Sequence, residues 1–384
     1  MALPFSVRAR EQTANSRAGR PGLSAFAAQT SPMEQSSPME QSSPTERSLP
    51  TDQSLPTEKL PPTAAAPVDF DLTGPLSIVA KRRVNESALT VFPVALGGST
   101  FGWTVDADTS MHILDRFSDQ GGNLIDTADS YAGGRSELII GGWLRARRNR
   151  DHVLISTKIG RNADNPGLGS VSMIRAVEAS LARLGTDHID ILVFHDEDST
   201  VPLEDSLATA EWLIETGKVR YLSAANFSAE RLIEARILSS TGLPQFVSIQ
   251  THYNLMHRAE FEGDVRVVAS AQSLAVMPYA SLAGGYLTGK YRSRDVVATS
   301  AAQAANALSY LGRKGNRVLT ALSRVAAMHR TTSASIALAW LLAKRSVTAT
   351  IASATSPEQV DDMMTAAGIR LTRAQMLELD RVSD

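Results

Sequence analysis

The chain has 384 residues, of which 43% are hydrophobic and 20% are charged, and its formal net charge is −2. This near-neutral balance argues against a nucleic-acid-binding protein, which usually carries a strongly basic surface. No apolar run reaches the roughly 18 residues that a membrane-spanning helix needs. Cysteine is absent, which excludes disulfide bonds, cysteine nucleophiles and zinc–thiolate sites and is compatible with a reducing compartment. We therefore expect a cytoplasmic protein without a membrane segment.

Residues 1–75 differ in composition from the rest of the chain. A hexad that contains one proline repeats five times between residues 30 and 59. Regularly spaced prolines remove backbone donors and oppose helix formation, and the stretch has little apolar surface to bury. We predict a disordered Pro/Ser/Thr-rich tail over 1–75. Four arginines in residues 1–29 weakly resemble an organelle transit peptide, although a disordered leader explains them more simply.

From about residue 76, short apolar stretches rich in β-forming residues alternate with amphipathic helical stretches. Ser172–Leu184, for example, has apolar residues at steps of three and four, the period of a helix. Eight strand candidates, each followed by a helix candidate, occur at residues 94–97, 123–126, 153–157, 189–194, 220–224, 246–250, 276–279 and 348–351. Continuous apolar strands favour parallel pairing, and eight βα units predict an α/β fold, a (β/α)8 TIM barrel. Residues 82–92 indicate a short hairpin before it.

An open doubly wound sheet is the alternative architecture. That fold normally carries a glycine-rich phosphate-binding fingerprint after its first strand. The nearest approach to it, Gly167-Leu-Gly169-Ser-Val-Ser, lacks the last glycine and lies several residues beyond its strand. A Gly-Lys-Ser/Thr phosphate loop is also missing from the sequence. We therefore predict one barrel domain over 76–384.

Polar residues stand at the ends of consecutive predicted strands, where the chemistry of such a barrel is found. The second, third and fourth strands end in Asp126, Lys158 and His195, and Tyr131 follows Asp126 by five residues. Each has an ordinary explanation when taken alone: Asp126 as a helix cap, for example, or Lys158 as a solvated side chain. Together, an acid, a tyrosine, a lysine and a histidine on three neighbouring strands indicate a catalytic site.

These four side chains suit the donation of a proton. A free phenol is a poor acid at neutral pH, but a nearby ammonium group stabilises the phenolate, and a carboxylate beside the lysine keeps that ammonium charged. A histidine can orient or polarise a carbonyl oxygen. Because the set contains no activated nucleophile, an electron pair must come from elsewhere, and a reduced nicotinamide is the natural donor.

Several motifs in a fixed order make residues 79–384 resemble the aldo-keto reductase superfamily. The matching stretches include Leu96-Gly-Gly-Ser-Thr-Phe-Gly-Trp103, Asn123-Leu-Ile-Asp-Thr-Ala-Asp-Ser-Tyr131, Gly134-Arg-Ser-Glu137, Ser156-Thr-Lys158, Ser180–Asp190, Gly217-Lys-Val-Arg-Tyr221 and Leu287-Thr-Gly-Lys-Tyr291. The resemblance implies that the N-terminal hairpin closes the barrel floor. It also implies a catalytic tetrad of Asp126, Tyr131, Lys158 and His195, with Tyr131 as the general acid.

The resemblance further implies that NADP(H) binds in an extended form without a Rossmann fold. It assigns the nicotinamide to Asn226, Gln250 and Tyr279, the pyrophosphate to Ser281, Leu282, Gly285 and Lys290, and the adenosine end to Ser353, Thr355, Gln359 and Asp362. Many members of the family have an arginine where this chain has Thr355. A hydroxyl brings no charge to the 2′-phosphate, so NAD(H) stays open as a cofactor.

The leading interpretation is an NADPH-dependent oxidoreductase that reduces the aldehyde or ketone group of a small molecule. The alternative is a nucleotide-binding regulatory module similar to potassium channel beta subunits. Those subunits depart from the histidine of the tetrad, so the presence of His195 favours an enzyme. A metal-dependent barrel hydrolase would need clustered ligands. His252 and His257 are five residues apart, a poor spacing for joint binding on one helix face, and no metal site is predicted.

Overall fold

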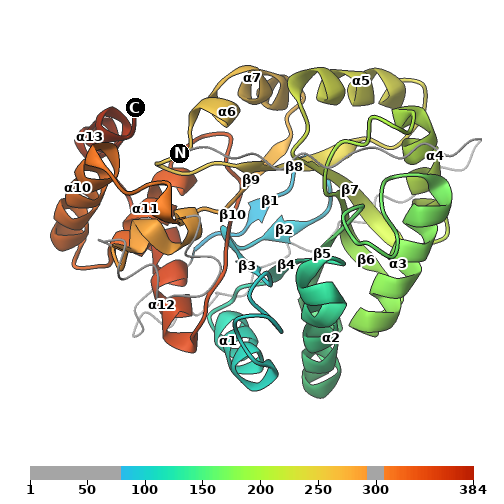
Figure 1. The fold of residues 1–384 in the computed structure, drawn as a ribbon, viewed down its shortest axis with the longest axis horizontal. Coiled ribbons are helices and arrows are strands. Elements are labelled where there is room, and N and C mark those ends of the chain that lie inside the picture. The colour runs from blue at the N-terminus through green and yellow to red at the C-terminus, as the bar shows by residue number, and fades with distance from the viewer. Residues whose placement is uncertain (1–78, 292–306) are drawn as a thin grey trace, which may run out of the picture. The chain divides into compact units, whose positions relative to one another are not determined.

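Eight parallel strands form a barrel that helices surround (Figure 1). The computed structural model describes residues 79–291 and 307–384, so the predicted tail over 1–75 lies outside the described residues. The strand order β10-β3-β4-β5-β6-β7-β8-β9 places successive strands side by side. All neighbouring pairs in this sheet are parallel. The predicted (β/α)8 barrel is therefore confirmed.

The barrel strands lie where the apolar stretches predicted them. They are β3 (Val94–Gly97), β4 (Leu124–Ala128), β5 (Leu154–Ile159), β6 (Ile189–Phe194), β7 (Val219–Ala225), β8 (Phe246–His252), β9 (Ala275–Tyr279) and β10 (Thr350–Ala352). Every observed end lies within two residues of its predicted position. The sheet closes because the backbone N–H of Thr348, just before β10, donates to the carbonyl of Val276 in β9 (2.9 Å).

Helices connect the strands on the outside of the barrel. They are α1 (Ala107–Asp119), α2 (Arg135–Arg147), α3 (Ser170–Leu184), α4 (Leu203–Glu215), α5 (Ala229–Ser239), α6 (Ala259–Glu262), α7 (Asp264–Ala271), α10 (Arg313–His329), α11 (Ser333–Leu342), α12 (Pro357–Thr365) and α13 (Arg373–Ser383). Short 3-10 helices are η1 (Tyr131–Gly134), η2 (Arg150–His152), η3 (Ala283–Thr288) and η4 (Ala366–Gly368). Within the described residues, no helix combines the length and the apolar character needed to cross a membrane.

The core consists of two apolar layers separated by the strands. In β6, Ile191 and Val193 belong to the inner cluster, whereas Leu192 and Phe194 belong to the outer one. Successive residues of a strand point to opposite faces, so one side of each strand fills the barrel and the other packs against helices. Both faces are buried, which explains the continuous apolar runs in the sequence.

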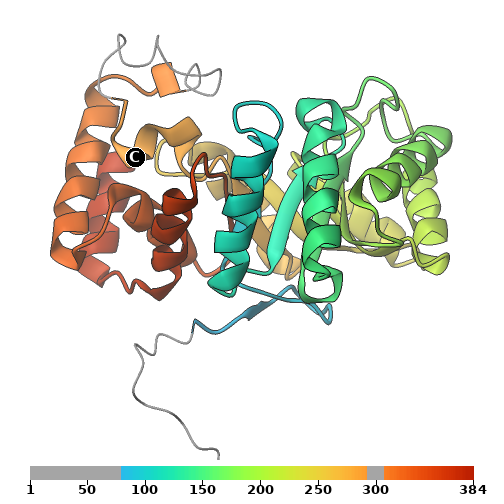
Figure 2. The same cartoon turned by 90° about the horizontal axis from the view of Figure 1, so that it is seen from below.

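An antiparallel hairpin closes one end of the barrel. It consists of β1 (Arg82–Arg83) and β2 (Thr90–Val91). Figure 2 shows it beneath the barrel strands. Its side chains Val84, Leu89 and Val91 join the same apolar cluster as the inner residues of the barrel. The predicted floor is therefore confirmed, and the other end of the barrel is left for the site.

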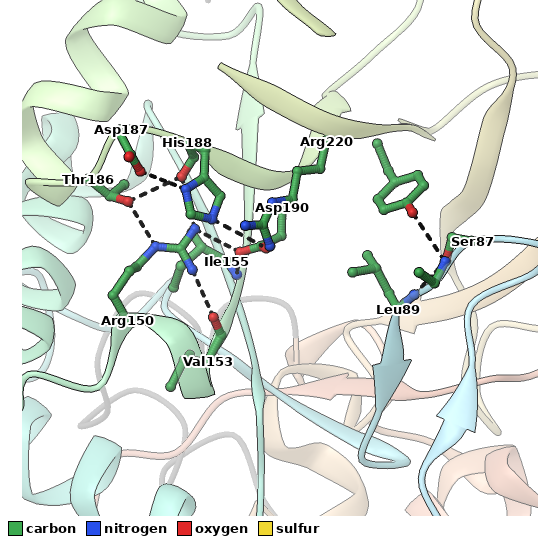
Figure 3. Close-up of polar contacts among 12 residues, drawn as sticks. Ser87, Leu89, Arg150, Val153, Ile155, Thr186, Asp187, His188, Asp190 and Arg220 are labelled. Atoms are coloured by element: carbon green, nitrogen blue, oxygen red, sulfur yellow. Dashed lines mark hydrogen bonds and ion pairs between the residues drawn. The ribbon is translucent and has the colours of Figure 1, made fainter. Parts of the chain in front are cut away.

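A buried polar network stabilises the same end of the barrel (Figure 3). Asp190 is completely buried and accepts hydrogen bonds from Arg150 Nη2 (2.8 Å), Arg220 Nη1 (2.9 Å) and the backbone N–H of Ile155 (2.9 Å). Asp190, Ile155 and Arg220 are each the second residue of their strands. A buried carboxylate is tolerated only when such partners compensate its charge. This network therefore serves the stability of the floor.

Candidate active site

The four residues of the predicted tetrad lie together at the C-terminal ends of β4, β5 and β6. Asp126 and Lys158 are in β4 and β5, His195 directly follows β6, and Tyr131 begins η1. The Nζ of Lys158 lies 5.0 Å from the centroid of the Tyr131 ring. The rings of Tyr131 and His195 have centroids 6.1 Å apart and are inclined at 79°. The hydroxyl-bearing ring thus lies beside both a cation and an imidazole.

Asp126 and Lys158 form an ion pair inside the barrel. Their side chains are only 3% and 4% exposed. Lys158 Nζ donates to Asp126 Oδ2 and to the carbonyl of Thr127 (2.8 Å). Asp126 Oδ1 accepts two more hydrogen bonds, from Ser156 Oγ (3.0 Å) and Gln250 Nε2 (2.6 Å). Every oxygen of the buried carboxylate therefore has a donor, which fixes the position of the ammonium group.

Lys158 remains charged despite its burial. Removal from water acts to lower the pKa of Lys158, but the negative charge of Asp126 and the interaction with Tyr131 outweigh it and raise the pKa overall. The ammonium group is therefore present at neutral pH. It lies close enough to the phenol ring to stabilise a phenolate there.

His195 has the opposite electrostatic character. Burial, with the nearby cations Lys158 and Arg161, lowers the pKa of His195 to about 2. The imidazole is therefore neutral at physiological pH. Its Nδ1 is buried and has no hydrogen-bond partner among the described residues. A neutral imidazole can donate a hydrogen bond to a carbonyl oxygen without giving up a proton.

The loop that carries Tyr131 has an unusual backbone. Residues 132–134 have φ angles of 51°, 65° and 86°, in the left-handed region that favours glycine. A Cβ at Gly134 would lie only 2.8 Å from Cδ of Arg183. The Nε of Arg183 in turn donates to Glu137 Oε2 (2.7 Å), and Glu137 is completely buried. This packing explains the glycine at position 134, because a side chain there would meet the arginine that Glu137 holds.

A buried acid that the sequence analysis did not single out lies next to this loop. Asp129 is 1% exposed, and neither of its carboxylate oxygens has a hydrogen-bond partner among the described residues. Burial, and then the charge of Glu137, raise the pKa of Asp129 to about 7. Its backbone N–H donates to the carbonyl of Lys158 (3.0 Å), which connects it to the tetrad. Its position in the sequence between Asp126 and Tyr131 is the feature that could have identified it as a site residue.

The sequence also did not predict an ion pair at the C-terminal end of the barrel, where the tetrad lies. Arg161 forms an ion pair with Asp196, and Asn226 Nδ2 donates to Asp196 Oδ1 (3.1 Å). The guanidinium contributes to the low pKa of His195. Arg161 and Asp196 each stand two residues after the end of a strand that leads to the tetrad, β5 and β6. That position was the signal that could have identified them.

The three residues expected at the nicotinamide form one group next to the tetrad. Tyr279 donates from its hydroxyl to Asn226 Oδ1 (2.6 Å), and Asn226 Nδ2 donates to the carbonyl of His195 (2.8 Å). Gln250 Nε2 binds Asp126. The Oε1 of Gln250 is buried and has no partner in the described part of the chain. An orphaned buried acceptor at this position fits the carboxamide of a nicotinamide, whose N–H groups would satisfy it.

The residues expected at the pyrophosphate lie after β9. Ser281 is buried, and its Oγ donates to backbone carbonyls of β9 (3.0 Å) and β10 (2.9 Å). Leu282 precedes η3. Gly285 has a φ of 89°, and a Cβ there would lie 3.0 Å from Cε of Lys290. Glycine therefore permits the lysine to fold back over the turn, where it would supply a cation to a phosphate.

Two of the four residues expected at the adenosine end, Ser353 and Thr355, lie between β10 and α12, and the other two, Gln359 and Asp362, lie in α12. Ser353 follows β10, and the backbone N–H of Thr355 donates to Gln359 Oε1 (2.9 Å). Gln359 Nε2 donates to Thr355 Oγ1 (3.1 Å). Asp362 instead packs against the beginning of α11, where its carbonyl accepts from Ser335 Oγ (2.7 Å). Burial raises the pKa of Asp362.

Comparison with known proteins agrees with the fold. The model of the Aldo/keto reductase family matches residues 93–384. The chain belongs to the aldo/keto reductase family. Its predicted membership is therefore confirmed.

Similar aldo/keto reductases include proteins named as enzymes and one named as a channel subunit. Aldo-keto reductase ausK of Emericella nidulans is 31% identical over 80% of this chain and 81% of its own length. Norsolorinic acid reductase of Aspergillus flavus is 28% identical over 80% of this chain and 82% of its own length. A probable voltage-gated potassium channel subunit beta of Oryza sativa subsp. japonica is 28% identical over 75% of this chain and 91% of its own length.

Asp129→Asn should change how stability depends on pH. The folded state raises the pKa of Asp129 from 3.8 to about 7. The contribution of this carboxyl is therefore fully present below about pH 4 and is lost as the pH rises to 7. Asparagine cannot ionise. The variant should gain about 2–3 kcal/mol in free energy of unfolding, relative to wild type, between pH 5 and pH 8.

Urea unfolding at the two pH values measures this difference. Asp164→Asn, a change at an exposed aspartate, is the matched control and should show the same difference from wild type at both. If Asp129→Asn behaves like this control, the buried carboxyl does not ionise near neutral pH.

Proposed function

We propose that this aldo/keto reductase is an NADPH-dependent oxidoreductase that reduces an aldehyde or ketone to an alcohol. One observation carries the proposal: the buried Lys158–Asp126 pair holds its ammonium 5.0 Å from the centre of the Tyr131 ring. A phenol next to a fixed cation is suited to donate a proton, and a neutral imidazole beside it is suited to bind a carbonyl oxygen. The relatives named as reductases support the same chemistry.

Tyr131 is the proposed general acid. When bound, the reduced nicotinamide would supply the hydride that attacks the carbonyl carbon. The Tyr131 hydroxyl donates its proton to the oxygen of that carbonyl as negative charge develops on it. Lys158 stabilises the phenolate that remains, and Asp126 holds Lys158 in position. His195, neutral because of its low pKa, donates a hydrogen bond that orients the carbonyl oxygen.

The cofactor is held, in this proposal, along the C-terminal ends of β7 to β10. Gln250 Oε1 and Asn226 would bind the carboxamide, and the Tyr279 ring would pack on the nicotinamide. Lys290, with Ser281, Leu282 and Gly285, would hold the pyrophosphate. Ser353, Thr355 and Gln359 would surround the adenosine end, whereas Asp362, which was expected there, contacts the beginning of α11. The catalytic domain extends over 76–384, and a small carbonyl compound is its partner.

Tyr131→Phe should lower kcat for a good aldehyde substrate by about 10²–10⁴-fold, the usual contribution of a general acid. The dissociation constant for NADPH should change little, because the aromatic ring stays. Tyr221→Phe is the matched control, since it removes a hydroxyl that contacts Ala88 in the hairpin at the floor (3.1 Å). It should leave kcat unaltered.

Initial rates of NADPH oxidation and fluorescence titration of the cofactor measure these two quantities. More than half of the wild-type rate in Tyr131→Phe would remove this residue from the chemistry. Tight NADPH binding without turnover of any carbonyl compound by the wild type would instead favour a regulatory module, in line with the channel subunit among the relatives.

Thr355→Arg should raise the preference for NADPH over NADH. The 2′-phosphate is present only in NADPH, and a charge-assisted contact is roughly twice as strong as a neutral one. We expect NADPH to bind more tightly by about 1–3 kcal/mol, the scale of a hydrogen bond to a charged group, while NADH changes little. Thr365→Arg adds the same charge at the other end of α12 and is the matched control.

Fluorescence titration of both cofactors with both variants gives the four dissociation constants. Equal tightening of NADPH and NADH in Thr355→Arg, or none, would show that the 2′-phosphate binds elsewhere.

A further inference from the structure

Two histidines that the sequence separates by five residues lie face to face at the end of β8. His252 is the last residue of this strand. The chain then turns back, because Asn254 and His257 pair as an isolated antiparallel bridge. The rings of His252 and His257 have centroids 3.9 Å apart and differ by only 9° in orientation. A spacing of five residues is poor for two metal ligands on one helix, but these histidines lie on a strand and the turn that follows it.

The turn between these histidines is fixed by a buried side chain. Asn254 is completely buried, and its Oδ1 accepts the backbone N–H groups of Met256 (2.8 Å) and His257 (3.0 Å). Its Nδ2 donates to the carbonyl of Ala280 (3.0 Å), just after β9. Both hydrogen-bonding groups of the asparagine are therefore used to hold the turn. The position of His257 beside His252 is a consequence of this anchoring, which reduces the entropy lost when both bind one ligand.

A carboxylate completes the group. Glu260 is in α6, which contacts β8. Glu260 Oε2 lies 2.6 Å from His257 Nε2. One potential ligand atom from each of His252, His257 and Glu260 lies within 4.8 Å of the others. Within residues 79–291 and 307–384, this is the only group of three such side chains found.

The distances and the chemistry of these atoms suit a divalent transition metal ion. Two imidazole nitrogens and a carboxylate oxygen are ligands of zinc sites that keep a fourth position open. With bond lengths of about 2.1 Å, two ligands of one tetrahedral zinc ion lie roughly 3.4 Å apart, so ligand atoms that are up to 4.8 Å apart need to close by as much as about 1.4 Å. The two parallel rings must also tilt, and the contact between His257 and Glu260 must open to admit the ion. The side chains of His257 and Glu260 are 35% and 57% exposed, which leaves room for this movement.

The surroundings favour a cation. Glu260 lines a cavity of about 550 Å³ together with the carboxylates Glu197, Glu230 and Asp264. A negative cavity raises the local concentration of divalent cations at the ligands.

We propose that His252, His257 and Glu260 form a binding site for a divalent transition metal ion such as Zn²⁺ at the rim of the barrel. The site is separate from the tetrad and takes no part in proton donation. It adjoins the proposed cofactor site, because the His252 ring also stacks on the Tyr279 ring, with centroids 5.5 Å apart and planes inclined at 20°. Metal binding itself does not depend on the proposed carbonyl reduction.

Calorimetric titration of the untagged full chain with Zn²⁺, after treatment with a chelator, tests the site. We expect one ion per chain, and Co²⁺ at the same site should give visible d–d absorption. His257→Ala and Glu260→Gln each remove one ligand from the exposed side of the site. Loss of an outer-shell partner of a metal ligand typically costs about 10–100-fold in affinity, so each variant should bind at least about tenfold more weakly than wild type.

Two matched controls separate ligation from general electrostatics. His152→Ala removes an exposed histidine elsewhere, and Asp264→Asn removes a negative charge from the same cavity without removing a ligand. Both should bind Zn²⁺ within about threefold of wild type, since screening weakens exposed charges. Thermal melts check that each variant is folded. Absence of binding to the wild type, or equal affinity of wild type, His257→Ala and Glu260→Gln, would overturn the proposal.

Discussion

A buried ion pair between a lysine and an aspartate inside the barrel determines much of this structure. Asp126 and Lys158 lie on adjacent parallel strands, in which Asp126 pairs with Ser156 and Ala128 pairs with Lys158. Because side chains alternate along a strand, Asp126, Ser156 and Lys158 all point to the same face, toward the barrel interior. Two charges in such a place are tolerated only with good geometry and with hydrogen bonds for the remaining donors and acceptors.

The same ion pair connects the fold to the proposed chemistry. Asp126 in β4 accepts a hydrogen bond from Gln250 in β8. These two strands are four positions apart in the strand order of the barrel. The ammonium of Lys158 faces the ring of Tyr131. Removal of either charge would leave the other one buried and uncompensated, which typically destabilises a protein by about 3–5 kcal/mol. The residues that position the proton donor are therefore also residues on which the interior of the barrel depends.

Buried acids at the two ends of the barrel differ in their hydrogen-bond partners. At the floor, Asp190 has two arginines and a backbone N–H as partners. At the mouth, Asp129 has no partner among the described residues, and its pKa rises to about 7. Unsatisfied groups and left-handed backbone, such as that of Ala132 with a φ of 51°, are unfavourable for stability. They gather where function is expected, as is common in enzymes.

The sequence predicted the strands well because each is buried on both faces and forms a continuous apolar run. It also placed the four predicted tetrad residues at or near the ends of these runs, where the structure brings them together. Contacts between distant segments could not be predicted from the sequence. Gln250 was expected at the nicotinamide, but its hydrogen bond to Asp126, which spans 124 residues, was not foreseen. The burial of Asp129 and the stacking of His252 on His257 depend on loops whose path no periodicity indicates. In each case the sequence shows the residue but does not show which distant residues it contacts.

The pH dependence of carbonyl reduction by Lys158→Met tests the central claim most directly. Without the ammonium, the phenolate of Tyr131 loses its stabilising charge and faces Asp126 alone. The rate should fall at least as far as in Tyr131→Phe, and the alkaline pH at which reduction declines should move upward. This comparison requires variants that remain folded and bind NADPH. A folded Lys158→Met protein with the wild-type rate and an unaltered pH profile would contradict the assignment of Lys158 to proton donation.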